Sequence, residues 1–300
     1  MKKGIYAFLL IVLLIVFGIW WFAVGEKTQL IVAPSHQKLK VVASGYVPYD
    51  LARQIGGDRI ELSQLIAAGT EPHHFEPTPG DIIKVNHSDL FIYVSKELEP
   101  WTQDILKGMP SVSFVESGPL FEGEDPHVWM TPYGALSMSE SILEALIRKD
   151  PKNKSYYKKN FKNFEEQIQS LHAAFKQGLS SCQSREMIHI GHLAFAALAK
   201  DYGLNLHALT GTSHQSEHSV RKLAGLIKLI KKNQVGAVFT EEMLSSDLAN
   251  TVSLETGVQI LPLYTVHAVS KEDFSQQKTY LEFMNQNLTN LQTGLRCQAL

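Results

Sequence analysis

Short apolar runs alternate with helix-like segments along most of the chain. Four such runs occur in each half of the sequence, and all are brief and rich in β-branched or aromatic residues, which is typical of buried parallel strands. The runs are Val41–Ser44, Ile60–Leu65, Leu90–Val94, Val112–Val115, Met187–Ile190, Leu204–Leu209, Val235–Phe239 and Val258–Leu263. The alternation predicts an α/β protein with two (β/α)4-like domains, each built on a mainly parallel sheet.

One long amphipathic segment separates the two halves. Asp150 stands at an N-cap position and Pro151 at the first helical position, a favourable start for a helix. Apolar residues then recur at spacings of 4, 3, 4, 3 and 4, namely Tyr157, Phe161, Phe164, Ile168, Leu171 and Phe175. This stripe predicts one rigid helix over about 152–180, about 45 Å long, that joins the domains and resists a wide hinge opening.

The first residues have the features of an export signal. Lys2 and Lys3 precede the apolar run Gly4–Val24, and Ala23–Gly25 offers the small residues that a signal peptidase needs. The run is also long enough to span a bilayer. Residues 1–25 are therefore expected to be either a cleaved signal peptide or an N-terminal signal anchor. No Cys lies near the end of the run, which excludes a lipid-anchored cysteine. The expected location is periplasmic or otherwise extracytoplasmic, either soluble or anchored to the inner membrane.

These patterns divide the chain into five segments. The expected boundaries are a signal peptide or anchor at 1–25, a linker at 26–39, an N-terminal α/β lobe at 40–150, a connecting helix at 151–181 and a C-terminal α/β lobe at 182–300.

The expected export also bears on the state of the two cysteines, Cys182 and Cys297. In an oxidising compartment two cysteines more often pair than stay free. A disulfide would tie the C-terminal tail to its own domain. Two unrelated buried thiols are the alternative, which periodicity does not decide.

Charge and histidine content limit the classes of partner and metal site that the chain can have. The chain has 28 basic and 30 acidic residues, a net charge of -2, and shows no basic stripe of the kind that neutralises a phosphate backbone, so nucleic acid is not an expected partner. It also has 12 His beside 2 Cys. A thiolate zinc cluster is thus excluded, and imidazole is the abundant metal donor.

Four histidines stand at or beyond the carboxyl ends of predicted strands. His73 lies in a stiff proline-rich loop, His127 follows Pro126, and His192 and His267 follow strands of the second half. Each alone is more often an ordinary polar or hydrogen-bonded residue. Open α/β sheets, however, bind ligands at this edge, so four such placements favour a metal cleft between the two domains.

Several motifs then carry a family resemblance. They are Gly56-Gly57-Asp58, Gly69–Pro77, Asp125–Trp129, His192–Phe195, Phe239–Glu241 and Glu255–Gly257. With them the chain resembles, from about Lys40 to Leu295, the zinc and manganese solute-binding proteins that serve ABC importers.

The resemblance implies metal ligands at His73, His127 and His192. The fourth ligand of the family is usually an Asp or Glu in the loop that here reads Leu263–Val269, where this chain has no carboxylate. We assign the fourth position to His267. Neutral imidazoles in a four-coordinate shell suit Zn²⁺, whereas Mn²⁺ prefers oxygen donors, so zinc is the expected ligand and manganese the alternative.

The remaining polar residues receive ordinary interpretations. We expect His74 to face solvent, Glu241 and Glu242 to be a surface pair at a helix start, and Thr212–His218 to be a mobile polar loop rather than an accessory metal site. The spacing of residues in the sequence gives Glu71 no partner for a catalytic role.

The expected function is that of a substrate-binding component of an ABC metal importer. It is not an enzyme, because the sequence contains none of the motifs of nucleophilic hydrolysis or zinc proteolysis. It is expected to be a monomer that captures Zn²⁺ and delivers it to a membrane permease. The alternatives are a zinc metallohydrolase on a similar two-domain scaffold and a surface adhesin in which metal is incidental.

Overall fold

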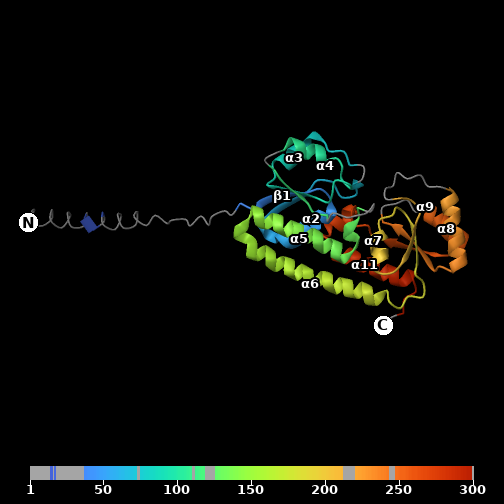
Figure 1. Cartoon of the computed structure of the whole chain (residues 1–300). Coiled ribbons are helices and arrows are strands. Elements are labelled where there is room, and N and C mark those ends of the chain that lie inside the picture. Colours follow the sequence, from blue (N-terminus) through green and yellow to red (C-terminus); the bar gives the residue numbers. More distant parts are fainter. Residues whose placement is uncertain are drawn as a thin grey trace, which may run out of the picture. The chain divides into compact units, whose positions relative to one another are not determined.

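The computed structural model describes most of the chain beyond residue 37 (Figure 1). The described residues are 14–15, 17, 37–72, 75–109, 112–118, 126–211, 220–242 and 247–298. The chain divides into two units, Met1–Gln37 and Lys38–Leu300, and both sheets that the structure describes belong to the second. Most of the expected signal and linker lies outside the described residues. Within the described part, no helix combines the length and the apolar character that crossing a membrane requires.

The first sheet consists of four parallel strands in the order β2-β1-β3-β4. Its strands are β1 (Leu39–Ala43), β2 (Ile60–Gln64), β3 (Leu90–Tyr93) and β4 (Ser113–Glu116). The helical segments between them are α2 (Tyr46–Gly56), η1 (Gly57–Arg59), α3 (Pro79–Asn86) and α4 (Thr102–Gly108). Thr78 begins α3 with a capping box, in which its side chain accepts from the backbone of Asp81.

The second sheet repeats this arrangement with the order β6-β5-β7-β8, again all parallel. Its strands are β5 (Glu186–Ile190), β6 (Asn205–Ala208), β7 (Ala237–Glu241) and β8 (Gln259–Leu263). The helices of this half are α7 (Ala196–Asp201), α8 (Val220–Asn233), α9 (Asp247–Thr256), α10 (Lys271–Ser275) and α11 (Tyr280–Gly294). The predicted α/β class with two parallel sheets is confirmed.

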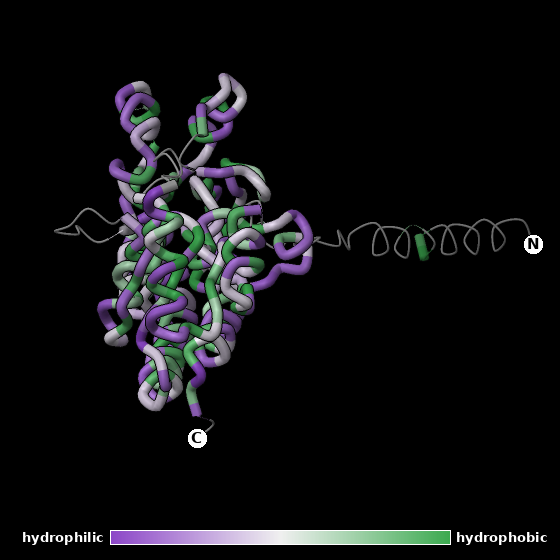
Figure 2. Tube along the Cα trace, turned by 90° about the vertical axis from the view of Figure 1, so that its right-hand side faces the viewer, coloured by the Kyte–Doolittle hydropathy of each residue, from purple (hydrophilic) through white to green (hydrophobic). Residues whose placement is uncertain are grey.

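A helical hairpin connects the two sheets. It comprises η3 (Val128–Met130), α5 (Pro132–Lys149), η4 (Pro151–Asn153) and α6 (Lys154–Gly178). Of the predicted stripe, only Phe161 is partly exposed, and the other five side chains are buried. Figure 2 shows hydrophilic and hydrophobic positions alternating along the helices, as expected where one face of each helix is buried.

The start of α6 differs from the prediction. Asp150 precedes a 3₁₀ turn rather than the α-helix, and its side chain caps no backbone group. Instead, Asp150 Oδ2 accepts hydrogen bonds from the Tyr157 hydroxyl at 2.8 Å and from Asn153 Nδ2 at 2.6 Å. The proline allows the turn to tighten, and α6 therefore begins only at Lys154.

One hydrophobic core runs through both halves. Among its fully buried side chains are Trp129, Tyr157, Phe195, Phe239 and Tyr280, which come from α6 and from the segments before and after it. Because Lys38–Leu300 forms a single unit, the boundaries of the two lobes and of the connecting segment stay a prediction.

The disulfide between Cys182 and Cys297 is present, as expected. It joins the residues that follow α6 to those that follow α11, across 115 positions of sequence. Backbone hydrogen bonds accompany it, from Gln183 to Arg296 at 3.2 Å and from Ser184 to Leu295 at 3.1 Å. The bridge thus holds the end of the last helix against the entry to the second sheet.

Candidate metal centre

Three of the predicted histidines lie together in the interior. His127, His192 and His267 are almost completely buried, and the candidate ligand atoms of the three rings all lie within 4.8 Å of one another. Nε2 of His127 lies 3.1 Å from Nε2 of His192. Each follows the carboxyl end of a strand: His127 comes after β4, His192 after β5 and His267 after β8. The two sheets therefore supply one histidine cluster.

His73 and His74 lie outside the described residues, but the loop that leads to them reaches the cluster. The backbone N–H of Gly69 donates to the carbonyl oxygen of Val269 at 2.8 Å. Glu71 Oε2 lies 3.3 Å from Nε2 of His267. The spacing of residues in the sequence gave Glu71 no partner, because His267 is 196 positions away and follows a strand of the other sheet.

A carboxylate holds the ring of His192. Glu241 Oε1 lies 2.7 Å from Nδ1 of His192 and accepts the backbone N–H of the same residue, also at 2.7 Å. The prediction of a surface acid at a helix start is wrong for Glu241, because β7 extends through this residue and the side chain is buried. With Nδ1 engaged by the carboxylate, Nε2 is the nitrogen directed toward His127.

Gly191 makes room for this contact. A β-carbon at Gly191 would overlap the Glu241 carboxylate and would lie 2.7 Å from Cε1 of His189. Glycine is therefore the residue that lets the turn after β5 pass so close to the end of β7.

The loop that carries His267 has a strained backbone. Val266 is β-branched yet has φ of 63°, in the left-handed region, and its side chain is fully buried. Trp129 Nε1 donates to the carbonyl oxygen of Thr265 at 2.8 Å. The Trp129 ring also packs against His127 and His267, with centroids 5.3 and 6.4 Å away. Trp129 thus fixes two of the imidazoles relative to each other.

The surroundings keep one imidazole neutral and favour protonation of another. Burial, and then the proximity of His192 and His267, hold the pKa of His127 well below its usual value. Burial also opposes protonation of His267, but the hydrogen bond and charge of Glu71, with the charge of Glu242, outweigh it and raise the pKa of His267. A neutral imidazole is the form that binds a metal ion.

Glu242 is also not the simple surface residue that was expected. Its carboxylate accepts the backbone N–H of Thr265 at 3.2 Å and lies 3.3 Å from the Thr265 hydroxyl. Burial raises the pKa of Glu242 to about 7. Both acids at the end of β7 therefore face the loops of the cluster.

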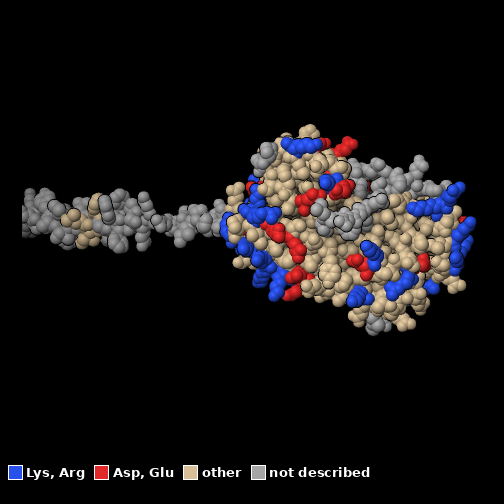
Figure 3. All heavy atoms as spheres, viewed as in Figure 1, with Lys and Arg blue, Asp and Glu red and all other residues tan. Residues whose placement is uncertain are grey.

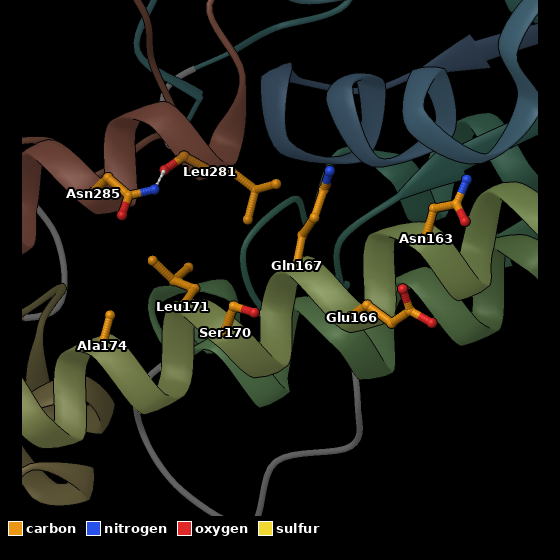
Figure 4. Close-up of a pocket in the computed structure, with 8 residues that line it drawn as sticks. All are labelled: Asn163, Glu166, Gln167, Ser170, Leu171, Ala174, Leu281 and Asn285. Carbon is orange, nitrogen blue, oxygen red and sulfur yellow. Dashed lines mark hydrogen bonds between the residues drawn. The ribbon is translucent and has the colours of Figure 1, made fainter.

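The histidine cluster is distinct from an open groove of about 710 Å³ between α6 and α11 (Figure 4). Asn163, Glu166, Gln167, Ser170, Leu171, Ala174, Leu281 and Asn285 line this groove. No histidine is among them, and Leu171 and Leu281 face each other across it. The groove offers no metal donor set. The segment Thr212–His218, interpreted as a mobile polar loop, lies outside the described residues.

Comparisons with known proteins agree on one family. The family model described as zinc-uptake complex component A, periplasmic (ZnuA), matches residues 41–294. The high-affinity zinc uptake system protein ZnuA of Bacillus subtilis is 33% identical over 281 residues, which cover 86% of this chain and 88% of that protein.

Two comparisons involve Streptococcus pneumoniae. Its zinc-binding lipoprotein AdcA is 32% identical over 277 residues, covering 85% of this chain but only 55% of AdcA, so the chain spans about half the length of that relative. The crystal structure of the Zn(II)-bound ZnuA-like domain of AdcA superposes with a TM-score of 0.77 at 34% identity, covering 86% of this chain and 99% of the domain. This chain therefore belongs to the family of periplasmic zinc-uptake complex component A proteins.

Proposed function

We propose that this chain is the extracytoplasmic substrate-binding component of an ABC importer, which captures Zn²⁺ and delivers it to a membrane permease. The observation that carries the proposal is the buried cluster of His127, His192 and His267, whose ligand atoms lie within 4.8 Å of one another. The zinc-related names of the family and of its relatives support the choice of metal. Zn²⁺ is here the cargo rather than a resident cofactor.

The ligand set we propose is His73, His127, His192 and His267. Zinc–nitrogen bonds of about 2.0–2.1 Å at tetrahedral angles separate two donor nitrogens by roughly 3.3 Å. The 3.1 Å between Nε2 of His127 and Nε2 of His192 is close to that separation. His73 is included because Glu71, two positions before it, already reaches His267.

Manganese is the alternative cargo, and one observation favours it. Glu71 places a carboxylate oxygen 3.3 Å from Nε2 of His267. If that oxygen took part in binding, the donor set would gain the carboxylate character that Mn²⁺ prefers. A Glu71→Gln substitution tests which metal is the cargo. It should weaken Mn²⁺ binding while leaving tight Zn²⁺ binding in place.

The proposal describes a carrier rather than an enzyme. A catalytic zinc site keeps a position open for water, whereas a carrier can complete its coordination with protein atoms, as four imidazoles would do. We further propose that the ligands reside in lobes 40–150 and 182–300, that segment 151–181 limits their relative motion, and that the protein acts as a monomer.

Titration calorimetry with the full chain tests the ligand set. His73→Ala, His127→Ala, His192→Ala and His267→Ala should each weaken Zn²⁺ binding by at least about tenfold, roughly 1.4 kcal/mol, because each removes a donor. The matched control is His207→Ala, since His207 on β6 pairs with Glu186 at 2.7 Å and lies outside the cluster. Parental affinity in two or more of the four variants would overturn the four-histidine site.

A further inference from the structure

Basic side chains are concentrated where α5 meets α6. Residues 148–162 contain seven of the 28 Lys and Arg residues of the chain, and all seven are exposed. They are Arg148, Lys149, Lys152, Lys154, Lys158, Lys159 and Lys162, together called the basic corner. The only acid in this stretch, Asp150, is buried and bonded to Tyr157 and Asn153. The expectation that the chain has no basic stripe therefore does not hold for this segment, whose local excess the near-neutral total charge does not reveal.

The basic corner has little internal neutralisation. Lys154, Lys158 and Lys162 are four residues apart and therefore form one row on α6, on a different face from the buried stripe. Arg148 pairs with Glu144 at 3.4 Å. Among the described residues, however, none of the six lysines of the corner forms an ion pair. Figure 3 shows Lys and Arg gathered at this end of the unit.

The corner lies at the amino edge of the first sheet. Arg59, which directly precedes β2, places its guanidinium 5.2 Å from the centre of the Tyr156 ring on α6. The same edge contains the start of β1, just after Lys38, where the chain enters this unit. The histidine cluster follows the opposite, carboxyl ends of the strands. The basic corner and the metal centre thus face different ends of the unit Lys38–Leu300.

We propose that the basic corner binds the anionic phospholipid headgroups of the membrane that the apolar run at residues 4–24 would enter. Each Lys or Arg close to an anionic bilayer contributes favourably, and the effect decays within about one Debye length. In the sequence, only 13 residues, 25–37, separate that apolar run from the unit that carries the basic corner. A connection this short in sequence would raise the effective concentration of the corner at a membrane that holds the apolar run. With the corner on the lipid surface, the histidine cluster, which follows the opposite ends of the strands, would face away from the bilayer.

Lysine footprinting of the full chain in vesicles tests the proposal without any metal. Acetylation of Lys154, Lys158 and Lys162 should slow by about fivefold or more in vesicles containing phosphatidylglycerol, relative to vesicles of phosphatidylcholine alone. High salt should restore the rate. Lys231 and Lys232, at the end of α8, serve as internal controls whose rates should not change.

Two charge-matched variants sharpen the test. The quadruple change Lys154→Gln, Lys158→Gln, Lys159→Gln and Lys162→Gln should abolish the protection of Lys149 and Lys152. The control change Lys222→Gln, Lys228→Gln, Lys231→Gln and Lys232→Gln removes the same charge from α8 and should leave that protection intact. Equal rates in the two vesicle types, equal protection of α8, or protection by a DNA duplex but not by phosphatidylglycerol would each overturn the proposal.

Discussion

Glu241 Oε1 lies 2.7 Å from both Nδ1 and the backbone nitrogen of His192. The contact exists because β5 and β7 are neighbouring strands, paired at Ile190 and Thr240, so that the residues after each pair meet at the sheet edge. A carboxylate on Nδ1 fixes the orientation of an imidazole and raises the basicity of Nε2. Glu241 is therefore expected to prepare His192 for metal binding without touching the metal.

Replacing this carboxylate should weaken metal binding. We expect Glu241→Gln to reduce Zn²⁺ affinity by about 10- to 100-fold, because the amide neither fixes the ring nor polarises it as strongly. Calorimetry measures the change. Glu186→Gln is the control, since Glu186 makes a similar 2.7 Å contact with His207 away from the cluster. An unchanged affinity in Glu241→Gln would mean that His192 is oriented by other contacts.

Gly191 provides a steric test of the same arrangement. Gly191→Ala adds a β-carbon that overlaps the Glu241 carboxylate, so either the turn or the acid must move. We expect Zn²⁺ affinity to fall at least about tenfold, roughly 1.4 kcal/mol, as the His192 ring is displaced. Gly225→Ala on α8, where a β-carbon meets nothing within 4 Å, is the matched control. Retention of parental affinity in Gly191→Ala would contradict the role assigned to Glu241.

The strands and the histidines could be predicted because their patterns are local in sequence. The carboxylates that contact the histidines could not be predicted in this way. Strand periodicity and a histidine just beyond each strand end are visible within about ten residues of sequence, so His127, His192 and His267 could be proposed as a group. The contacts Glu71–His267 and Glu241–His192 join residues far apart in sequence, and only the tertiary structure brings them together. Strand order was the missing information for Glu241, because it alone places β7 beside β5.

Acidification should weaken metal binding, and Glu71 should set the pH at which the loss of affinity begins. Protons compete with the metal at His267, whose pKa is raised by Glu71, more than at His127, whose pKa is held low. Affinity should therefore fall as pH decreases, less steeply than the roughly four powers of ten per unit of four freely titrating imidazoles. Glu71→Gln should move the onset to lower pH. Competition with a chelator between about pH 5 and 7.5 measures both effects. If Glu71→Gln left the pH dependence of metal affinity unchanged, Glu71 would not be the group that raises the pKa of His267.

A buried acid outside the histidine cluster should make the stability of the protein depend on pH. Glu99 is 1% exposed, and its Oε2 accepts the backbone N–H of Val94 at 2.6 Å. Burial raises the pKa of Glu99 to about 7, although the hydrogen bond from the backbone N–H of Val94 opposes the shift. The usual value is 4.5. Between these two pH values the folded state binds a proton that the unfolded state does not, so the free energy of unfolding falls as pH rises through this window.

Glu99→Gln should remove that dependence, because the amide does not ionise. The stability of the variant relative to the parent should increase between about pH 4.5 and 7 by up to about 3 kcal/mol, and should change little above the raised pKa. Thermal unfolding of the chelator-treated proteins measures the difference, and removal of metal keeps binding from adding its own pH dependence. Glu97→Gln, an exposed change two positions away, controls for the loss of one negative charge. If the difference between Glu99→Gln and the parent were the same at pH 5 and pH 8, Glu99 would ionise as readily in the folded state as in the unfolded one.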